Sequence, residues 1–195
     1  SEMCIRDRPV IDAMTWDELL EQGRFSAYDR AAVDLLRPGT NDVCEVMFTS
    51  GTTGQPKGVM HTQNTLNAAV DCFVDAVCDG VSSPGRTADG PGYIFHMAST
   101  LAHQTGYLFG IRAPLTVGGH VVLQDVWDPS EFVDLIEQHQ IQISMGATPF
   151  LADVLAVEAV ESRDLSSWKR FVCAGAAVPE PILEDADARR PCVVL

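Results

Sequence analysis

The sequence has no long apolar run, and this absence excludes a membrane-spanning helix. Its apolar stretches are short and are interrupted by charged residues, glycine or proline, whereas a helix needs about 20 apolar residues to cross a bilayer. No apolar segment typical of a secretory signal follows the N-terminus. We therefore predict a soluble, cytoplasmic protein without a transmembrane segment.

Basic residues are also scarce. The chain has 195 residues, with 13 Lys and Arg against 27 Asp and Glu, and its formal net charge is −14. This charge argues against nucleic acid as a partner, because such binding depends on clustered basic side chains that neutralise phosphates. It also repels a nucleotide, so a phosphate-binding site here requires a local group of hydrogen-bond donors and a divalent cation.

The cysteines lack the spacing of a zinc site or a disulfide framework, since no CxxC pair occurs. We predict that they are buried, reduced thiols. Four histidines are scattered, and Asp71, Asp75 and Asp79 share one face of a predicted helix, so we interpret both sets as structural or solvated and predict no cluster of metal ligands. These cysteines and histidines are Cys4, Cys44, Cys72, Cys78, Cys173 and Cys192, and His61, His96, His120 and His139.

Apolar patterning alternates between strands and helices along the chain. Segments rich in β-branched residues predict strands at residues 43–49, 59–61, 92–97, 120–124, 141–146 and 171–174. Helical spacing predicts helices at residues 64–78, 104–111, 129–138, 149–158 and 179–188. This alternation implies parallel βαβ units, so the predicted fold class is α/β, with a mostly parallel sheet flanked by helices.

Capping signals mark several predicted helix starts. Thr15 begins a capping box that opens a short helix, and Asp128 begins another before residues 129–138. Thr148, which is followed by proline, is predicted to cap residues 149–158.

The two ends of the chain differ from the rest. Residues 1–8, SEMCIRDR, resemble translated adapter read-through and are predicted to be a non-native leader. Residues 191–195 are typical of the start of a buried strand rather than of a domain end. We therefore predict that residues 9–195 form a partial domain, truncated at both ends.

Residues 49–57, TSGTTGQPK, carry the main chemical signal. Glycines let backbone N–H groups approach an anion, hydroxyl groups add donors, and Lys57 supplies a positive charge. The segment is not a Walker A loop, because Pro56 stands where glycine is needed and Gly58 stands where a magnesium-binding hydroxyl is needed. The pattern therefore favours phosphate binding of another kind.

This segment resembles, at every position, the signature loop of the adenylate-forming superfamily, which includes acyl-CoA synthetases, luciferases and peptide-synthetase adenylation domains. In that family the loop closes over the β- and γ-phosphates of ATP while a carboxylate attacks the α-phosphate. The resemblance implies that Lys57 is catalytic and that Thr49 also faces Mg²⁺. The ATP-binding residues that it implies here are Thr49, Ser50, Gly51, Thr52, Thr53, Gly54 and Lys57.

Two later segments carry the same resemblance. Residues 95–106, FHMASTLAHQTG, resemble the motif whose aromatic or histidine side chain lies against the acyl pocket, although Thr100 replaces the usual proline. Residues 171–181, FVCAGAAVPEP, resemble the segment that packs against the adenine ring, although Val178 replaces a proline. The resemblance implies a second catalytic residue, His103, further ATP-binding residues, Gly175, Ala176 and Ala177, and acyl-pocket residues, His103, Ala147 and Thr148.

Within the superfamily, the sequence most resembles medium-chain and cyclohexanecarboxylate–CoA ligases. An amino-acid substrate is disfavoured, because the aspartate that binds the amino group in adenylation domains is absent near His103. The resemblance implies an AMP-forming acyl-CoA synthetase of fatty acid metabolism that uses a carboxylic acid, ATP, Mg²⁺ and coenzyme A. It covers only a middle slice of such an enzyme, so we predict that the isolated chain has negligible activity. A non-catalytic ATP- or phosphate-binding module and a purely structural α/β domain stay open as alternatives.

Overall fold

The computed structural model describes residues 16–25, 34, 37–49, 56–79, 81, 92–189 and 192–195. It divides into two units, residues 1–39 and residues 40–195, which are considered separately. The first unit contains helix α1 (Trp16–Phe25), whose first turn carries acidic residues that stabilise the helix dipole. The helix begins where the sequence predicts it, whereas its predicted cap, Thr15, and the predicted leader lie outside the described residues.

An antiparallel hairpin opens the second unit. Strand β1 (Val43–Thr49) pairs with strand β2 (Lys57–Thr62), so Thr49 and Lys57 stand opposite each other at the end of the hairpin. Both predicted strands are confirmed, and β2 is longer than predicted at each end.

Helix α3 (Gln63–Cys78) follows β2 directly. The Thr62 hydroxyl accepts a hydrogen bond from the Thr65 backbone, and the Thr65 hydroxyl accepts one from the Thr62 backbone, which makes a reciprocal capping box. The helix buries Leu66, Val70 and Val77, the apolar stripe that its sequence spacing predicts.

Arginine side chains bond both ends of α3 to other elements. Arg112 donates to the side-chain oxygens of Gln63 and Asn67, at 3.0 and 2.6 Å, in the first turns of the helix. Arg170 donates to the backbone oxygen of Asp79 at the C-cap, at 3.0 Å.

The main sheet has five parallel strands in the order β4-β3-β5-β6-β7. Their bounds are β3 (Ile94–Met97), β4 (His120–Leu123), β5 (Ile143–Gly146), β6 (Arg170–Cys173) and β7 (Val193–Val194). Each lies within or beside a segment that the sequence predicts as a strand. The predicted α/β class with a mostly parallel sheet is therefore confirmed.

The helices that connect these strands agree with the predicted segments, with differences at their ends. They are the π-helix η2 (Thr105–Arg112), α4 (Ala113–Val117), α5 (Pro129–His139), α6 (Thr148–Leu155), the 3-10 helix η3 (Glu158–Glu161) and α7 (Glu180–Arg189). The segment predicted at residues 104–111 therefore has π rather than α geometry and continues into α4. The helix predicted to run to residue 158 ends at Leu155.

Two predicted caps have different outcomes. The Asp128 carboxylate accepts hydrogen bonds from the backbone N–H groups of Ser130 and Glu131, which confirms it as the N-cap of α5. The prediction for Thr148 is wrong, because Ala147 occupies the N-cap of α6 and makes no side-chain capping bond.

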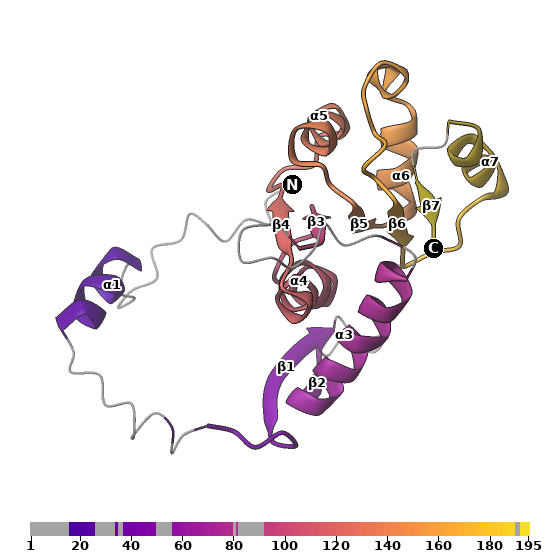
Figure 1. Cartoon of the computed structure of the whole chain (residues 1–195). Coiled ribbons are helices and arrows are strands. Elements are labelled where there is room, and N and C mark those ends of the chain that lie inside the picture. Colours follow the sequence, from indigo (N-terminus) through magenta and orange to yellow (C-terminus); the bar gives the residue numbers. More distant parts are fainter. Residues whose placement is uncertain are drawn as a thin grey trace. The chain divides into compact units, whose positions relative to one another are not determined.

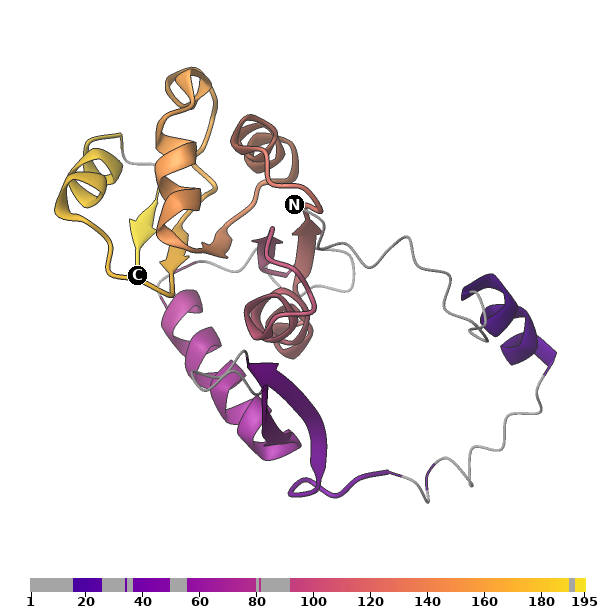
Figure 2. The same ribbon diagram turned by 180° about the vertical axis from the view of Figure 1, so that it is seen from behind.

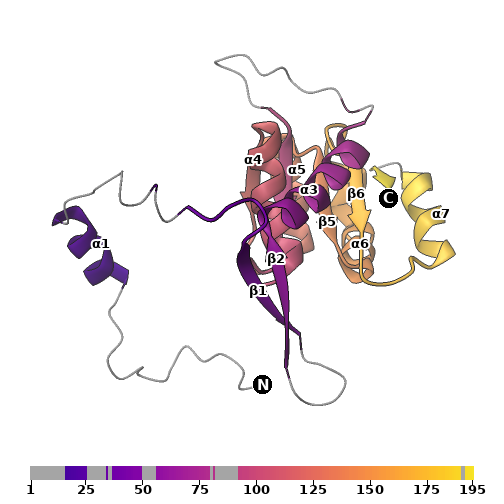
Figure 3. The ribbon, with the colours of Figure 1, turned by 90° about the horizontal axis from the view of Figure 1, so that it is seen from below.

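Helices cover both faces of the main sheet. In Figure 1 the strands lie between α5 and α6 on one side and α3 and α4 on the other, and Figure 2 gives the same arrangement from behind. Figure 3, which looks from the α3 and α4 side, places α3 in front of the strands. The core on the α5–α7 side contains Phe132, Ile136, Leu151, Trp168 and Phe171, and the other side contains Val77, Phe95 and Ile143.

The prediction that the cysteines are buried is wrong for two of them. Cys44 and Cys72 are exposed, whereas Cys78, Cys173 and Cys192 are partly buried. All the cysteines in the described residues are free thiols, and Cys4 lies outside those residues.

Candidate functional site

The connections of the main sheet change direction between β3 and β5. From β3 the chain moves outward to β4, which is one edge strand of the sheet. From β5, which lies on the other side of β3, it moves outward in the opposite direction through β6 to β7. Loops that leave two such neighbouring strands in opposite directions open a crevice at the carboxyl edge of the sheet, which is where α/β proteins bind ligands. The segments that follow β3, β5 and β6 carry the predicted site residues at this edge: His103 in a loop, Ala147 and Thr148 at the start of α6, and Gly175 to Ala177 in a loop.

His103 lies in the loop between β3 and η2 and is exposed. Its ring atom Nδ1 is 3.1 Å from both the backbone nitrogen and the hydroxyl oxygen of Thr105. Its backbone N–H donates to the Thr100 carbonyl oxygen at 3.1 Å, and the Thr100 hydroxyl accepts from the Ala102 backbone. Thr100 therefore closes the turn by hydrogen bonds, which a proline at this position supplies only in part.

Ala147 and Thr148 follow the carboxyl end of β5. Ala147 is exposed, but Thr148 is only 8% exposed. The Thr148 hydroxyl lies 3.3 Å from the Cys173 thiol at the end of β6. This contact joins the loops that carry the predicted acyl-pocket and adenine-binding residues.

The loop after β6 contains Gly175, Ala176 and Ala177, all of them exposed. Gly175 has a φ of 94°, a conformation that L side chains rarely adopt, and a Cβ at this position would find no atom within 4 Å. The backbone here therefore combines a glycine-dependent turn with open space, which allows a flat group to approach closely.

Only the flanks of the predicted phosphate-binding loop belong to the described residues. The Thr49 hydroxyl donates to the backbone oxygen of Lys57 at 3.4 Å, and both residues are exposed. Ser50, Gly51, Thr52, Thr53 and Gly54 lie outside the described residues. The hairpin therefore sets the direction in which the chain enters and leaves the loop.

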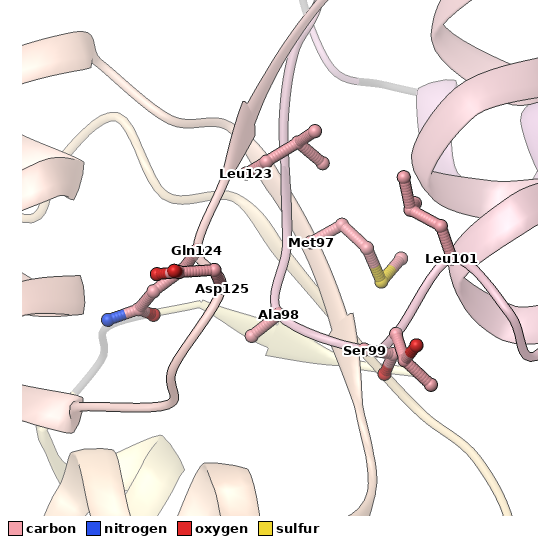
Figure 4. Close-up of a pocket in the computed structure, with 8 residues that line it drawn as sticks. Met97, Ala98, Ser99, Leu101, Leu123, Gln124 and Asp125 are labelled. Carbon is pink, nitrogen blue, oxygen red and sulfur yellow. The ribbon is translucent and has the colours of Figure 1, made fainter. Parts of the chain in front are cut away.

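A hollow of about 400 Å³ lies at the carboxyl ends of β3 and β4, next to the loop that carries His103. Its lining includes Met97, Ser99, Leu101, Leu123 and Gln124. Figure 4 shows the Leu123 side chain extending toward Met97, whereas the Gln124 side chain extends to the other side of its strand. These residues belong to none of the predicted sites, and only the predicted ends of strands 92–97 and 120–124 indicated that they share one edge of the sheet.

Beside this hollow, His96 is buried against helix α5. It is 3% exposed, and its ring centroid lies 4.2 Å from that of Phe132. Burial lowers the pKa of His96 to about 4, and the neighbouring Gln124 side chain acts more weakly in the opposite direction. The Gln124 amide donates to the Asp128 backbone and the Glu131 carboxylate, at 2.9 and 2.8 Å. Its oxygen and His96 Nε2 have no hydrogen-bond partner among the described residues.

A parallel sheet with three candidate segments gathered at a change of strand direction has the architecture at which α/β proteins bind small molecules. The chain belongs to the AMP-binding enzyme family, whose model matches residues 4–195. This match includes the segments at residues 49–57, 95–106 and 171–181.

Individual relatives agree with this family. The chain is 34% identical to a medium-chain fatty-acid–CoA ligase of Escherichia coli over 149 residues, which are 76% of this chain and 25% of that protein. It is 33% identical to 4-coumarate–CoA ligase 1 of Oryza sativa over 183 residues, 92% of this chain and 31% of that protein. The solved N-terminal domain of FACL13 from Mycobacterium tuberculosis shares the fold, with a TM-score of 0.71, 22% identity, and coverage of 92% of this chain and 41% of that chain.

The chain spans about a quarter to a third of the length of these curated relatives. In the part of the chain that the structure describes, no helix is long and apolar enough to cross a membrane. The same residues contain no group of three or more histidine, cysteine or acidic side chains arranged to hold a metal ion.

Proposed function

We propose that the chain is part of an AMP-forming acyl-CoA synthetase and corresponds to part of its N-terminal, AMP-binding domain. The observation that supports this most directly is the position of the three segments that carry His103, Thr148 and Gly175 at one carboxyl edge of the sheet. Family membership and relatives named as fatty-acid– and coumarate–CoA ligases support the same reaction.

The proposed reaction has two steps. A carboxylate oxygen attacks the α-phosphorus of ATP, a bond forms between them, and pyrophosphate leaves, which gives an acyl-adenylate. The thiolate of coenzyme A then attacks the acyl carbon, and AMP leaves with the electron pair of the broken C–O bond. In the first step the protein mainly positions the reactants and stabilises charge.

On the nucleotide side, the available donors suit ATP. We assign Lys57 and residues 49–54 to the β- and γ-phosphates. Lys57 is an exposed, positively charged residue where the chain leaves the loop, and it lies opposite Thr49, where the chain enters the loop. The open backbone at Gly175, Ala176 and Ala177 suits the adenine ring. Mg²⁺ would neutralise phosphate charge, and the Thr49 hydroxyl is the oxygen donor of this chain that we assign to it.

On the acid side, we assign His103, Ala147 and Thr148 to the acyl pocket. His103 supplies an exposed ring nitrogen near the reacting carboxylate. The Thr148 hydroxyl lies 3.3 Å from the Cys173 thiol, so it already has a partner within the protein. We propose a medium-chain or alicyclic acid as the substrate, in line with the medium-chain relative.

The test is carboxylate-dependent pyrophosphate release by the full-length protein from the completed gene, with cyclohexanecarboxylate, hexanoate, benzoate and an amino acid. We expect release with one of the first three acids and none with the isolated 195-residue chain. Full-length protein that binds ATP but releases no pyrophosphate with any acid would instead support a non-catalytic ATP-binding module.

A lysine pair provides the matched control. Lys57→Ala should lower pyrophosphate release by about 100-fold or more, as the loss of a transition-state charge contact does in other enzymes. Lys169→Ala, at an exposed position away from the proposed phosphates, should leave the rate within about twofold. Equal rates for both variants would remove Lys57 from the proposed mechanism.

A further inference from the structure

The contact between His103 and Thr105 determines which ring nitrogen of His103 carries the proton. The Thr105 backbone N–H points at His103 Nδ1, with 3.1 Å between the two nitrogens. A backbone N–H can only donate, so Nδ1 must present its lone pair. The neutral ring then carries its proton on Nε2. The Thr105 hydroxyl, also 3.1 Å from Nδ1, donates to the same lone pair or lies beside it.

The backbone around His103 holds the ring in this orientation. The His103 N–H donates to the Thr100 carbonyl oxygen, and the His103 carbonyl oxygen accepts from the Tyr107 N–H, at 3.1 and 3.0 Å. Gly106 allows the first turn of η2 to pack against the preceding loop, because a Cβ there would lie 2.2 Å from the Thr100 oxygen. Side chain and main chain are therefore fixed together at the start of η2.

We infer that Thr105 is a positioning residue that holds His103 as an Nε2–H donor. His103 then presents a proton, and no lone pair, to the ligand, and the fitting partner is an oxygen acceptor such as the carboxylate of the acid. No partner of Nε2 is present among the described residues, so this donor is available. The role toward substrate rests on the proposed function, whereas the tautomer itself does not.

The tautomer can be read by long-range ¹H–¹⁵N correlation NMR on the ¹⁵N-labelled chain at pH 8. The chain has five histidines, and a His103→Asn spectrum identifies the His103 signals. We expect His103 to have an unprotonated Nδ1 and a protonated Nε2 without averaging, in contrast to the exposed His139, which serves as the internal control. A tautomer-averaged pattern, or a proton on Nδ1 of His103, would overturn the inference.

Hydrogen exchange at the Thr105 amide gives a second, independent readout. His103→Ala removes the acceptor and should speed exchange about fivefold or more, the effect expected from losing a helix cap. His103→Asn offers an amide oxygen at the same place and should restore protection. Equal exchange in all three proteins would contradict the inference even if full-length protein activates an acid. Conversely, loss of the acid-activating function would leave the tautomer measurement unchanged.

Discussion

Burial of His96 should make the stability of the chain depend on pH between about 6.5 and 4. In the folded protein the ring is 3% exposed and packs on Phe132, and burial lowers its pKa from 6.5 to about 4. The unfolded chain therefore binds the proton more readily than the folded chain. Stability from this group is fully present above pH 6.5 and is lost as the pH falls toward 4.

The size of the effect follows from the two pKa values. A difference of about 2.5 pKa units corresponds to about 3 kcal/mol of unfolding free energy lost by pH 4, of which about 2 kcal/mol is already lost at pH 5. Carboxylates also titrate in this range, so the useful quantity is the difference between wild type and His96→Phe. Phenylalanine cannot titrate, and its ring can pack against Phe132.

The assay is urea unfolding followed by tryptophan fluorescence at pH 8, 7, 6 and 5. We expect the stability of His96→Phe relative to wild type to rise by about 2 kcal/mol between pH 8 and pH 5. His139→Gln, at the exposed end of α5, serves as the control and should run parallel to wild type. Parallel curves for His96→Phe and wild type would refute the reasoning.

Three further changes test the packing and the thiols. Trp168→Phe should lower the unfolding free energy by about 2 kcal/mol, because the buried indole N–H donates to the Ser144 hydroxyl at 2.7 Å and that hydroxyl would lose its donor; an unchanged urea midpoint would contradict this. Gly106→Ala should destabilise the chain by about 2 kcal/mol or more, since its Cβ would overlap a backbone oxygen, and a midpoint equal to wild type would show that the loop can move aside. At pH 8, iodoacetamide should label exposed Cys72 well before Cys192, because burial raises the pKa of the Cys192 thiol to about 12; mass spectrometry would reveal the opposite order if the reasoning were wrong.

Local sequence was sufficient for the strands and most helices. The segment at residues 43–49 was predicted with the bounds that the structure gives, because its apolar and β-branched residues end at a glycine- and threonine-rich loop. Asp128 was predicted as a cap because its donors are two and three residues away along the chain. The switch-point position of the three site segments was not predicted, because it depends on the strand order β4-β3-β5-β6-β7.

Contacts between distant residues account for what the sequence analysis missed. Thr148 does not cap α6, and its hydroxyl instead lies against Cys173, which is 25 residues further along the chain. The π geometry of η2 accompanies close contact of Gly106 with the backbone of Ser99 and Thr100. The burial of His96 beside Gln124 depends on β4 lying next to β3, and composition contains no sign of that order.

The bonds that Arg112 and Arg170 make to opposite ends of α3 limit how far the hairpin can tilt. A helix of 16 residues is about 24 Å long, so a 1 Å displacement at one end rotates its axis by only about 2 to 3 degrees. Because β2 enters α3 without an intervening loop, the hairpin rotates with the helix. β1 is about 24 Å long, so the same rotation moves the Thr49 end by about 1 Å. The side chains of Arg112 and Arg170 thus help to fix the angle at which the predicted phosphate-binding segment is presented.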